Sequence, residues 1–268
     1  MDFIELKENI SNLYRDFFID MKINPQTGIV EGTNRRFSGY PYIGANYVNA
    51  PIKILFIPLD TGKDECFEEN TFHSFENRES IFPTGMLNFN AHIAGVYATA
   101  LYVLKEKMGY QGAWDSLWNN RVFKSAKAIR KSYDSLPKDL MSYVAYENRF
   151  RFVTIGRGWK LDNYIIAEDG TVTKKKQEKT EKDSIEERGG SKDRVWINPQ
   201  REAQLLMDEI DVFAPDIIVF QGTTDLWNCH INELEKKYKV VIAYHPSYYK
   251  GGADKLQYIV EKIGPQLL

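Results

Sequence analysis

Two side chains of this sequence could together hydrolyse a bond: the carboxylate of Asp60 and the imidazole of His245. Each stands at the end of an apolar run that is typical of a buried strand, and each begins a loop that contains Gly, Pro or Ser. A carboxylate and an imidazole on opposite walls of a cleft form a workable acid–base pair. Taken alone, Asp60 is explained equally well as a turn residue, and His245 is better explained as a satisfied core or turn histidine. The pair does not by itself identify a substrate.

The elements that must position these residues alternate between strands and helices. Apolar runs predict strands over residues 52–60, 149–155, 216–222 and 240–245, and apolar stripes predict helices over residues 93–104, 121–131, 199–213, 224–237 and 254–263. This alternation predicts an α/β fold, a three-layer sandwich with a central, mostly parallel sheet. Chemistry in such sheets sits at the carboxyl ends of the strands, so we expect Asp60, His245 and a third strand end from Thr154 to Arg157 to converge there.

The domain organisation is expected to be a single domain over residues 1–268. Residues 1–51 form an N-terminal extension of helix and loop. Residues 168–195 are mostly charged and cannot bury a core face, so this insert should be an exposed loop or a protruding hairpin.

Composition narrows the possible function classes. The net charge is −2 and the isoelectric point is near 6.2, so any DNA binding must use a local basic patch. The two cysteines, Cys66 and Cys229, are too few for a disulfide framework, an iron–sulfur cluster or a cysteine zinc site, and the histidines lack metal-ligand spacing. No run reaches 18 apolar residues, and the N-terminus lacks the pattern of a signal peptide. We therefore expect a monomeric cytoplasmic protein without metal or cofactor.

Three segments carry a resemblance to a known family. They are Pro58-Leu59-Asp60-Thr61-Gly62 after the opening strand, the apolar strand from Pro215 to Gly222, and Tyr244-His245-Pro246-Ser247 near the end. In order and approximate spacing they resemble the uracil-DNA glycosylase superfamily over residues 53–263, with the charged insert skipped. The resemblance implies a uracil-DNA glycosylase-like fold and a monofunctional DNA glycosylase, which hydrolyses the bond between a base and its sugar and leaves an abasic site.

The resemblance also implies roles for individual residues. Asp60 would orient the attacking water and stabilise the cationic sugar, and His245 would hydrogen-bond the departing base. The base must be flipped out of the helix to reach this pocket. The implied base pocket comprises Leu59, Thr61, Gly62, Phe72, Thr154, Gly156 and Arg157, with Phe72 stacking on the base. The implied contacts to the DNA backbone, and the wedge that fills the vacated space, comprise Ser247, Tyr248, Tyr249, Lys250, Arg35, Arg36 and Lys124.

The sequence departs from the family pattern at one position. Uracil enzymes of this superfamily end the middle strand with an asparagine that reads the uracil edge, whereas the predicted strand over residues 149–155 has none before Asn163. Because a site built to hydrogen-bond one base rejects others, this absence points to a modified or enlarged base. Glucosylated hydroxymethylcytosine in phage DNA is the candidate, which would make the setting antiviral defence.

Two alternatives stay open. One is a uracil-DNA glycosylase of base-excision repair, and the other is a non-catalytic member of the fold that binds DNA or a protein. Other α/β hydrolases and nucleotide-binding proteins lack support, because the sequence has no Gly-x-Ser-x-Gly elbow, no Gly-x-Gly-x-x-Gly helix start and no Gly-Lys-Ser/Thr phosphate loop.

Overall fold

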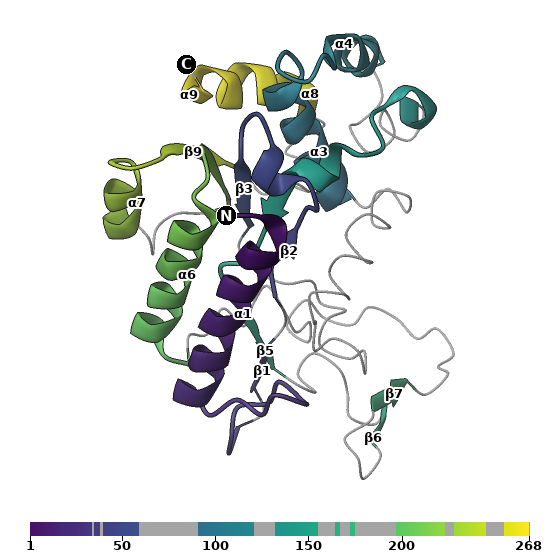
Figure 1. Cartoon of the computed structure of the whole chain (residues 1–268). Coiled ribbons are helices and arrows are strands. Elements are labelled where there is room, and N and C mark those ends of the chain that lie inside the picture. Colours follow the sequence, from purple (N-terminus) through teal and green to yellow (C-terminus); the bar gives the residue numbers. More distant parts are fainter. Residues whose placement is uncertain are drawn as a thin grey trace.

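The computed structural model describes residues 1–33, 35–37, 40–58, 91–120, 132–154, 164–166, 172–174, 197–222, 228–244 and 255–267. Its central sheet has five strands in the order β2-β4-β3-β8-β9 (Figure 1). They are β2 (Tyr42–Ile43), β4 (Val144–Tyr146), β3 (Ile54–Pro58), β8 (Ile217–Gln221) and β9 (Lys239–Ala243). Four strands are parallel, and β2 runs antiparallel to β4. The predicted α/β class with a mostly parallel sheet is confirmed.

Helices cover both faces of this sheet (Figure 1). Strand alternation sends Leu55 and Ile57 into one apolar cluster, with α1 (Phe3–Asp20) and α6 (Pro199–Phe213). Ile54 and Phe56 pack in the opposite cluster, with α3 (Ala91–Leu104) and the C-terminal helical segment. We call these the α1–α6 face and the α3 face. The arrangement is compatible with a three-layer sandwich.

Helix α6 shows how local sequence fixes an element. The side chain of Asn198 accepts a hydrogen bond from the N–H of Arg201 (3.1 Å), and Pro199 occupies the first helical position. Glu202 reaches back from the first turn, where one carboxylate oxygen accepts from the N–H groups of Ile197 (2.7 Å) and Asn198 (2.9 Å). Backbone N–H groups at the start of α6 therefore have hydrogen-bond acceptors in the side chains of Asn198 and Glu202.

The strand predicted over residues 149–155 is shorter than expected and does not belong to the central sheet. The structure has β5 (Phe152–Thr154) there, paired with β1 (Arg35–Phe37) in a separate two-stranded sheet. The strand beside β3 is instead β4, only three residues long and preceded by the 3-10 turn η4 (Leu140–Tyr143). The alternation of Arg149-Phe150-Arg151 was misleading because all three side chains are buried, arginines included. A polar position in the sequence is not always an exposed one.

Other described elements complete the chain. They are η1 (Tyr47–Asn49), α4 (Gln111–Asn119), η3 (Tyr133–Ser135), β6 (Tyr164–Ile166), β7 (Val172–Lys174), α7 (Asn228–Leu234), α8 (Lys255–Tyr258), the π-helical turn η7 (Ile259–Ile263) and α9 (Gly264–Leu267). The pair β6–β7 is antiparallel, and β7 falls inside the charged insert, whose remaining residues and the predicted helix over 121–131 lie outside the described part of the chain. Among the described residues, no helix combines the length and apolar character needed to cross a bilayer.

The C-terminal helix runs further than predicted. We expected it to end before Gly264-Pro265, but these residues open α9. Proline is tolerated in a first helical turn, where its missing N–H is not needed. Beyond it, the carboxamide of Gln266 pairs with the open side of β9, accepting from the Ile242 N–H (2.9 Å) and donating to the Ile242 carbonyl (3.1 Å).

Candidate active site

Three of the four parallel strands end on one row. Pro58 of β3 pairs with Gln221 of β8, which pairs with Ala243 of β9. On the other side of β3, the ladder continues beyond β4: the N–H of Glu147 donates to the Phe56 carbonyl (3.0 Å) and the N–H of Arg149 donates to the Pro58 carbonyl (3.0 Å). Asn148 therefore stands beside Pro58. We call Asn148, Pro58, Gln221 and Ala243 the edge row.

The two predicted catalytic residues follow this row in sequence. Asp60 comes two residues after Pro58, and His245 comes two residues after Ala243. Both lie outside the described residues, but the strands that lead to them do end at the same edge, separated by β8 alone. Eleven more predicted site residues also lie outside the described residues. They are Leu59, Thr61, Gly62, Phe72, Lys124, Gly156, Arg157, Ser247, Tyr248, Tyr249 and Lys250.

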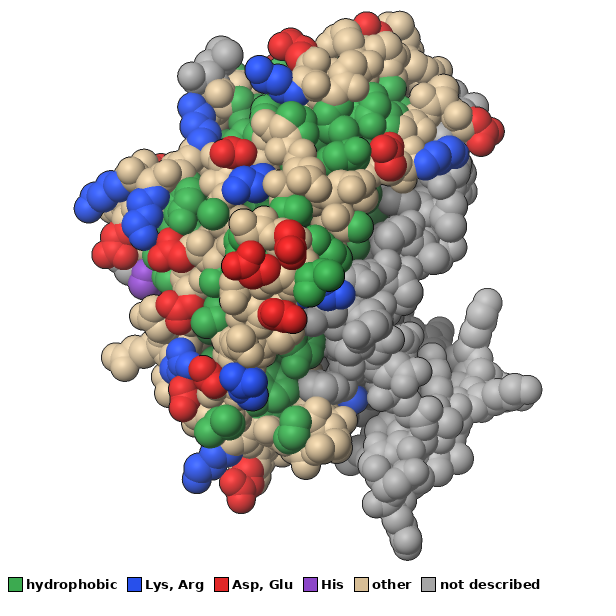
Figure 2. Space-filling view, viewed as in Figure 1, with side chains coloured by type: hydrophobic (Ala, Val, Ile, Leu, Met, Phe, Trp, Pro, Cys, Tyr) green, Lys and Arg blue, Asp and Glu red, His purple; other side chains and the backbone are tan. Residues whose placement is uncertain are grey.

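Three predicted residues are described, and none lies in the edge row. Thr154 is in β5 opposite Arg35, so the premise that it ends a strand of the central sheet is wrong. Arg35 and Arg36 are half-buried in β1, and Arg36 Nε donates to the Thr27 carbonyl (3.0 Å). On the face of the molecule in Figure 2, the described basic and acidic side chains are interspersed. Phosphate binding by these arginines stays a prediction.

Asn148 is a polar residue of this edge that the sequence analysis missed. Its side chain is 7% exposed, and its Oδ1 has no hydrogen-bond partner among the described residues. Its backbone carbonyl accepts from Arg151 Nε (3.0 Å). The available signal was the short apolar run Val144-Ala145-Tyr146 followed at once by polar residues, but three residues are too few for a reliable strand pattern.

Gln221 is the second missed residue. It ends β8 with a side chain that is 3% exposed, and its Oε1 also has no hydrogen-bond partner in the described part of the chain. Alternation along β8 places Gln221 on the α3 face, with Ile217 and Val219. Because the β4 ladder continues, alternation likewise places Asn148 on the face of Tyr146, which is also the α3 face. Two buried carboxamides thus share one row and one face.

An imidazole and a phenol lie next to this position. Tyr146, two residues before Asn148, contacts His92 at the start of α3, with 2.6 Å between the Tyr146 Oη and the His92 Nε2. The two rings meet edge to face, with 5.6 Å between their centroids. The α3 face therefore has two carboxamides in the edge row and, two residues before Asn148 on β4, a phenol that contacts an imidazole of α3.

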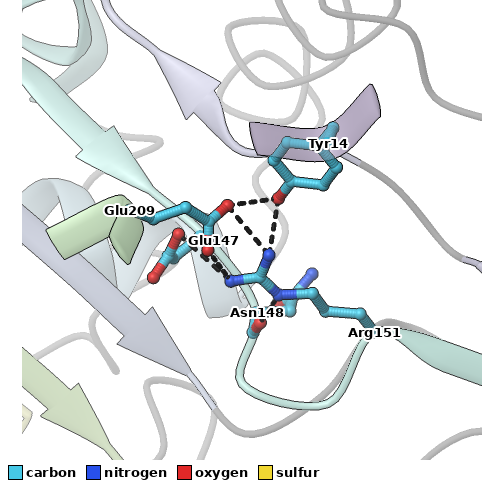
Figure 3. A network of polar contacts seen from close by, with 5 residues as sticks. All are labelled: Tyr14, Glu147, Asn148, Arg151 and Glu209. Carbon is cyan, nitrogen blue, oxygen red and sulfur yellow. Dashed lines mark hydrogen bonds and ion pairs between the residues drawn. The ribbon is translucent and has the colours of Figure 1, made fainter. Parts of the chain in front are cut away.

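The α1–α6 face carries a compact charged network instead (Figure 3). Arg151 Nη1 donates to Glu209 Oε1 (2.8 Å) and to Tyr14 Oη (2.6 Å), while Nη2 bonds the other Glu209 oxygen. The Tyr14 hydroxyl donates to Glu209, and Glu147 forms an ion pair with Arg151 Nη2 at 3.3 Å. All four side chains are buried. The network ties α1, α6 and the segment after β4 together beneath Asn148.

Burial sets the protonation of this network. Burial by itself lowers the pKa of Arg151, but Glu209, Tyr14 and Glu147 outweigh it and raise that pKa above its ordinary value. Burial, followed by the nearby Glu209, raises the pKa of Glu147 well above its ordinary value. With two carboxylates around one guanidinium, the site favours a proton on Glu147, which can then donate to Glu209.

The described residues hold no group of three or more His, Cys, Asp or Glu that could bind a metal ion. Comparisons with models of protein families, with curated proteins and with solved structures found no match to this chain.

Proposed function

We propose that this protein is a DNA glycosylase that hydrolyses the N-glycosidic bond of a flipped base. The observation that carries the proposal is the edge row, in which β3 and β9 end level with the buried Asn148, whose Oδ1 has no hydrogen-bond partner among the described residues. Asp60 and His245 follow that row by two residues each, and two residues span at most about 7 Å of chain. Both residues therefore follow strands whose last residues belong to the edge row.

The chemistry assigns each residue one task. As the bond between the sugar C1′ and the base nitrogen breaks, positive charge grows on the sugar and negative charge on the base. The Asp60 carboxylate stabilises the sugar cation and orients a water, whose oxygen bonds to C1′ and whose proton leaves through that carboxylate. His245 hydrogen-bonds the base as it becomes anionic, and the base then takes up a proton from solvent. Asn148 hydrogen-bonds the base edge.

The position of Asn148 changes the argument about which base is removed. The sequence argument for an enlarged base depended on the lack of an asparagine at the end of the middle strand. Since the strand beside β3 is β4, and Asn148 follows it, that argument no longer favours a modified base over uracil. Uracil and glucosylated hydroxymethylcytosine are both retained as candidate substrates.

Base release from a panel of DNAs tests the proposal. The panel contains uracil, hypoxanthine, hydroxymethylcytosine and glucosylated hydroxymethylcytosine, in single and double strands, and abasic sites are detected by strand cleavage. We expect release from at least one substrate, with a loss of about 100-fold or more in Asp60→Ala and His245→Ala, the scale of removing a charge-stabilising or acid–base group.

The matched control is Asp134→Ala, which removes a fully exposed carboxylate that is not among the predicted site residues. It should leave base release unchanged. No release of any base by the wild-type protein, together with retained DNA binding, would replace the proposal with the non-catalytic alternative.

A further inference from the structure

We propose that Tyr244 positions the substrate by stacking its ring on the nucleobase next to the flipped one, and that Tyr258 holds this ring in place. The inference rests on the proposed glycosylase function and deepens it, because it names a DNA contact outside the base pocket. Tyr244 directly precedes His245 and was not among the predicted site residues.

The exposure of Tyr244 is the first observation. Its side chain is 62% exposed, whereas the other Phe, Tyr and Trp side chains that the structure describes are half-buried or buried. Ile242, two residues earlier on β9, is also exposed, because β9 forms a border of the sheet. A large aromatic ring that is kept in water offers apolar surface which a flat partner such as a nucleobase can cover.

Tyr244 is exposed and yet held in place. Its ring stacks on the ring of Tyr258, with 5.2 Å between the centroids and 24° between the planes. Its backbone N–H donates to the Tyr258 hydroxyl (2.8 Å). Tyr258 is itself fixed, because the nearby Leu256 and Ile259 are buried in the cluster on the α3 face. A ring that is ordered before binding loses little conformational entropy when a base stacks on it.

The stack with Tyr258 determines how a base can bind. A side chain that wedges between two base steps contacts a base on each of its faces. One face of the Tyr244 ring is covered by Tyr258, so a base can stack only on the other face. The Tyr244 ring therefore ends a stack of bases and does not enter it. This mode of binding suits a base beside the flipped nucleotide.

The position of Tyr244 in the chain links it to the proposed site. It directly follows Ala243, the edge-row residue of β9, and adjacent Cα atoms are ~3.8 Å apart. The proposed catalytic His245 comes next. The nucleotides on either side of a flipped base are joined to it by the DNA backbone, so a residue that flanks His245 is well placed to contact one of them.

Stacking also suits the charge of this protein. The net charge is −2, and the described basic and acidic side chains are interspersed on the face in Figure 2, so the described part of this face has no continuous basic track for phosphates. Stacking of a base on an aromatic ring does not require a charge and tolerates every base. We therefore expect Tyr244 to contribute affinity without selecting a sequence.

The first measurement is the DNA affinity of the full-length protein. The probe is a single-stranded DNA with a stable abasic-site analogue, the product of the proposed reaction, beside a fluorescent adenine analogue that stacking quenches. We expect Tyr244→Ala to weaken binding by about fivefold or more, the lower end of the range for one base stacked on an aromatic ring, and to raise the emission of the bound probe. Tyr244→Phe keeps the ring and should restore both the affinity and the quenching.

The matched control is Ile242→Ala, which removes an exposed apolar side chain from the same strand but no ring. It should leave the affinity and the emission unchanged. An equal loss in Ile242→Ala, or wild-type affinity in Tyr244→Ala, would overturn the stacking role of Tyr244.

The second measurement is the kinetics of release of the base that the panel identifies. Tyr244→Ala should raise KM by about fivefold or more and change kcat by less than about twofold, because the ring contacts a neighbouring nucleotide and not the reacting atoms. A fall in kcat at unchanged KM would place Tyr244 in the chemical step and overturn the inference.

The two measurements separate the two proposals. DNA binding that depends on the Tyr244 ring, without release of any base, supports the stacking role and overturns the glycosylase. Base release with the wild-type KM and affinity in Tyr244→Ala overturns the stacking role and leaves the glycosylase standing. Neither binding nor release by the wild type overturns both.

A folding defect must be distinguished from a loss of stacking. The N–H that donates to the Tyr258 hydroxyl belongs to the backbone, so Tyr244→Ala can keep this hydrogen bond, and thermal unfolding of each variant checks the fold. If Tyr244→Ala does not fold, Tyr244→Leu keeps apolar bulk without a ring, and the same loss of affinity and quenching is expected. A Leu variant that folds and binds the probe like the wild type would refute the role of the ring.

Discussion

The two faces of the sheet treat buried polar groups in opposite ways at the same edge. On the α1–α6 face, the Arg151 guanidinium is hydrogen-bonded by Glu209 and Tyr14 and is paired in charge with Glu147, whose own oxygens have no hydrogen-bond partner among the described residues. On the α3 face, Asn148 and Gln221 each keep an unpaired oxygen within the described residues. Buried groups that satisfy each other stabilise a fold, and buried groups left without partners are suited to a ligand. The comparison distinguishes buried polar groups that stabilise the fold from buried polar groups that are suited to binding a ligand.

The largest expected effect comes from breaking the compensated side. Arg151→Met removes the cation that pairs with both Glu147 and Glu209, and leaves these buried acids without it. We expect the free energy of unfolding in urea to fall by ~3–5 kcal/mol. Adding Glu209→Leu should restore part of the loss, because it removes the orphaned acid. A drop below about 1 kcal/mol in the single variant would show that the network does not depend on its cation.

Glu202 is an intermediate case, because its carboxylate accepts from two N–H groups and also feels the charge of Arg151, and it gives a pH dependence. Burial raises its pKa to about 7, against the lowering effect of the hydrogen bonds from Asn198 and Ile197. Between pH 4.5 and 7 the folded state then binds more protons than the unfolded state, so stability falls as pH rises. The contribution is present below pH 4.5, is lost through about pH 7, and amounts to at most ~3 kcal/mol.

Glu202→Gln keeps the accepting oxygen and removes the titration. Urea unfolding at pH 5 and pH 8 should therefore show a smaller decline in the variant than in the wild type. Glu147 has a raised pKa of the same sign and remains in both proteins, so the difference between them isolates Glu202. Equal declines would mean that Glu202 ionises at its ordinary pKa.

Tyr14→Phe removes one hydroxyl from the network without removing a charge. Burial, the largest cause, raises the pKa of Tyr14 well above its ordinary value, so the phenol stays protonated and can donate to Glu209. Its loss leaves Arg151 paired with both acids, and we expect a decrease of ~1–2 kcal/mol in unfolding free energy. A loss as large as that of Arg151→Met would show that the tyrosine, rather than the ion pairs, holds the network.

Gln221→Leu should have the smallest effect on stability. It replaces a buried carboxamide, whose Oε1 has no hydrogen-bond partner among the described residues, by an apolar group of similar length, so the unfolding free energy should change by less than about 1 kcal/mol or rise. Chemical denaturation of the variant and of the wild type tests this. A loss above ~2 kcal/mol would mean that Gln221 supports the fold, and would weaken the contrast between the two faces.

Local patterns predicted much of the fold. The cap at Asn198-Pro199, the buried strands β3 and β8, and the alternation of strands with helices were all visible in the sequence. Strand β4 was not, because three residues leave no periodic signal, and the buried arginines nearby imitate an alternating strand.

The residues of the candidate site were likewise only partly predictable from the sequence. Asp60 and His245 were proposed as site residues because each follows a long apolar run. Tyr14 and Glu209 are 195 residues apart, and Arg151 and Glu209 are 58 apart, so only the folded chain brings them together. Asn148 and Gln221 become a pair only when β4, β3 and β8 are known to be neighbours. Pairings across a sheet are a property of topology, which residue types alone do not determine.

The side chain of Gln266 has a consequence for the behaviour of this protein at high concentration. Strand β9 forms one border of the sheet, and an open border offers its backbone to a strand of another molecule, which is a common start of aggregation. The N–H and the carbonyl of Ile242 are already hydrogen-bonded by the Gln266 carboxamide. At this one residue, the side chain takes the place of a neighbouring strand. The Gln266 side chain thus hinders the pairing of another strand with β9 at Ile242. A chain shortened before Gln266 would lose this protection against edge-to-edge association.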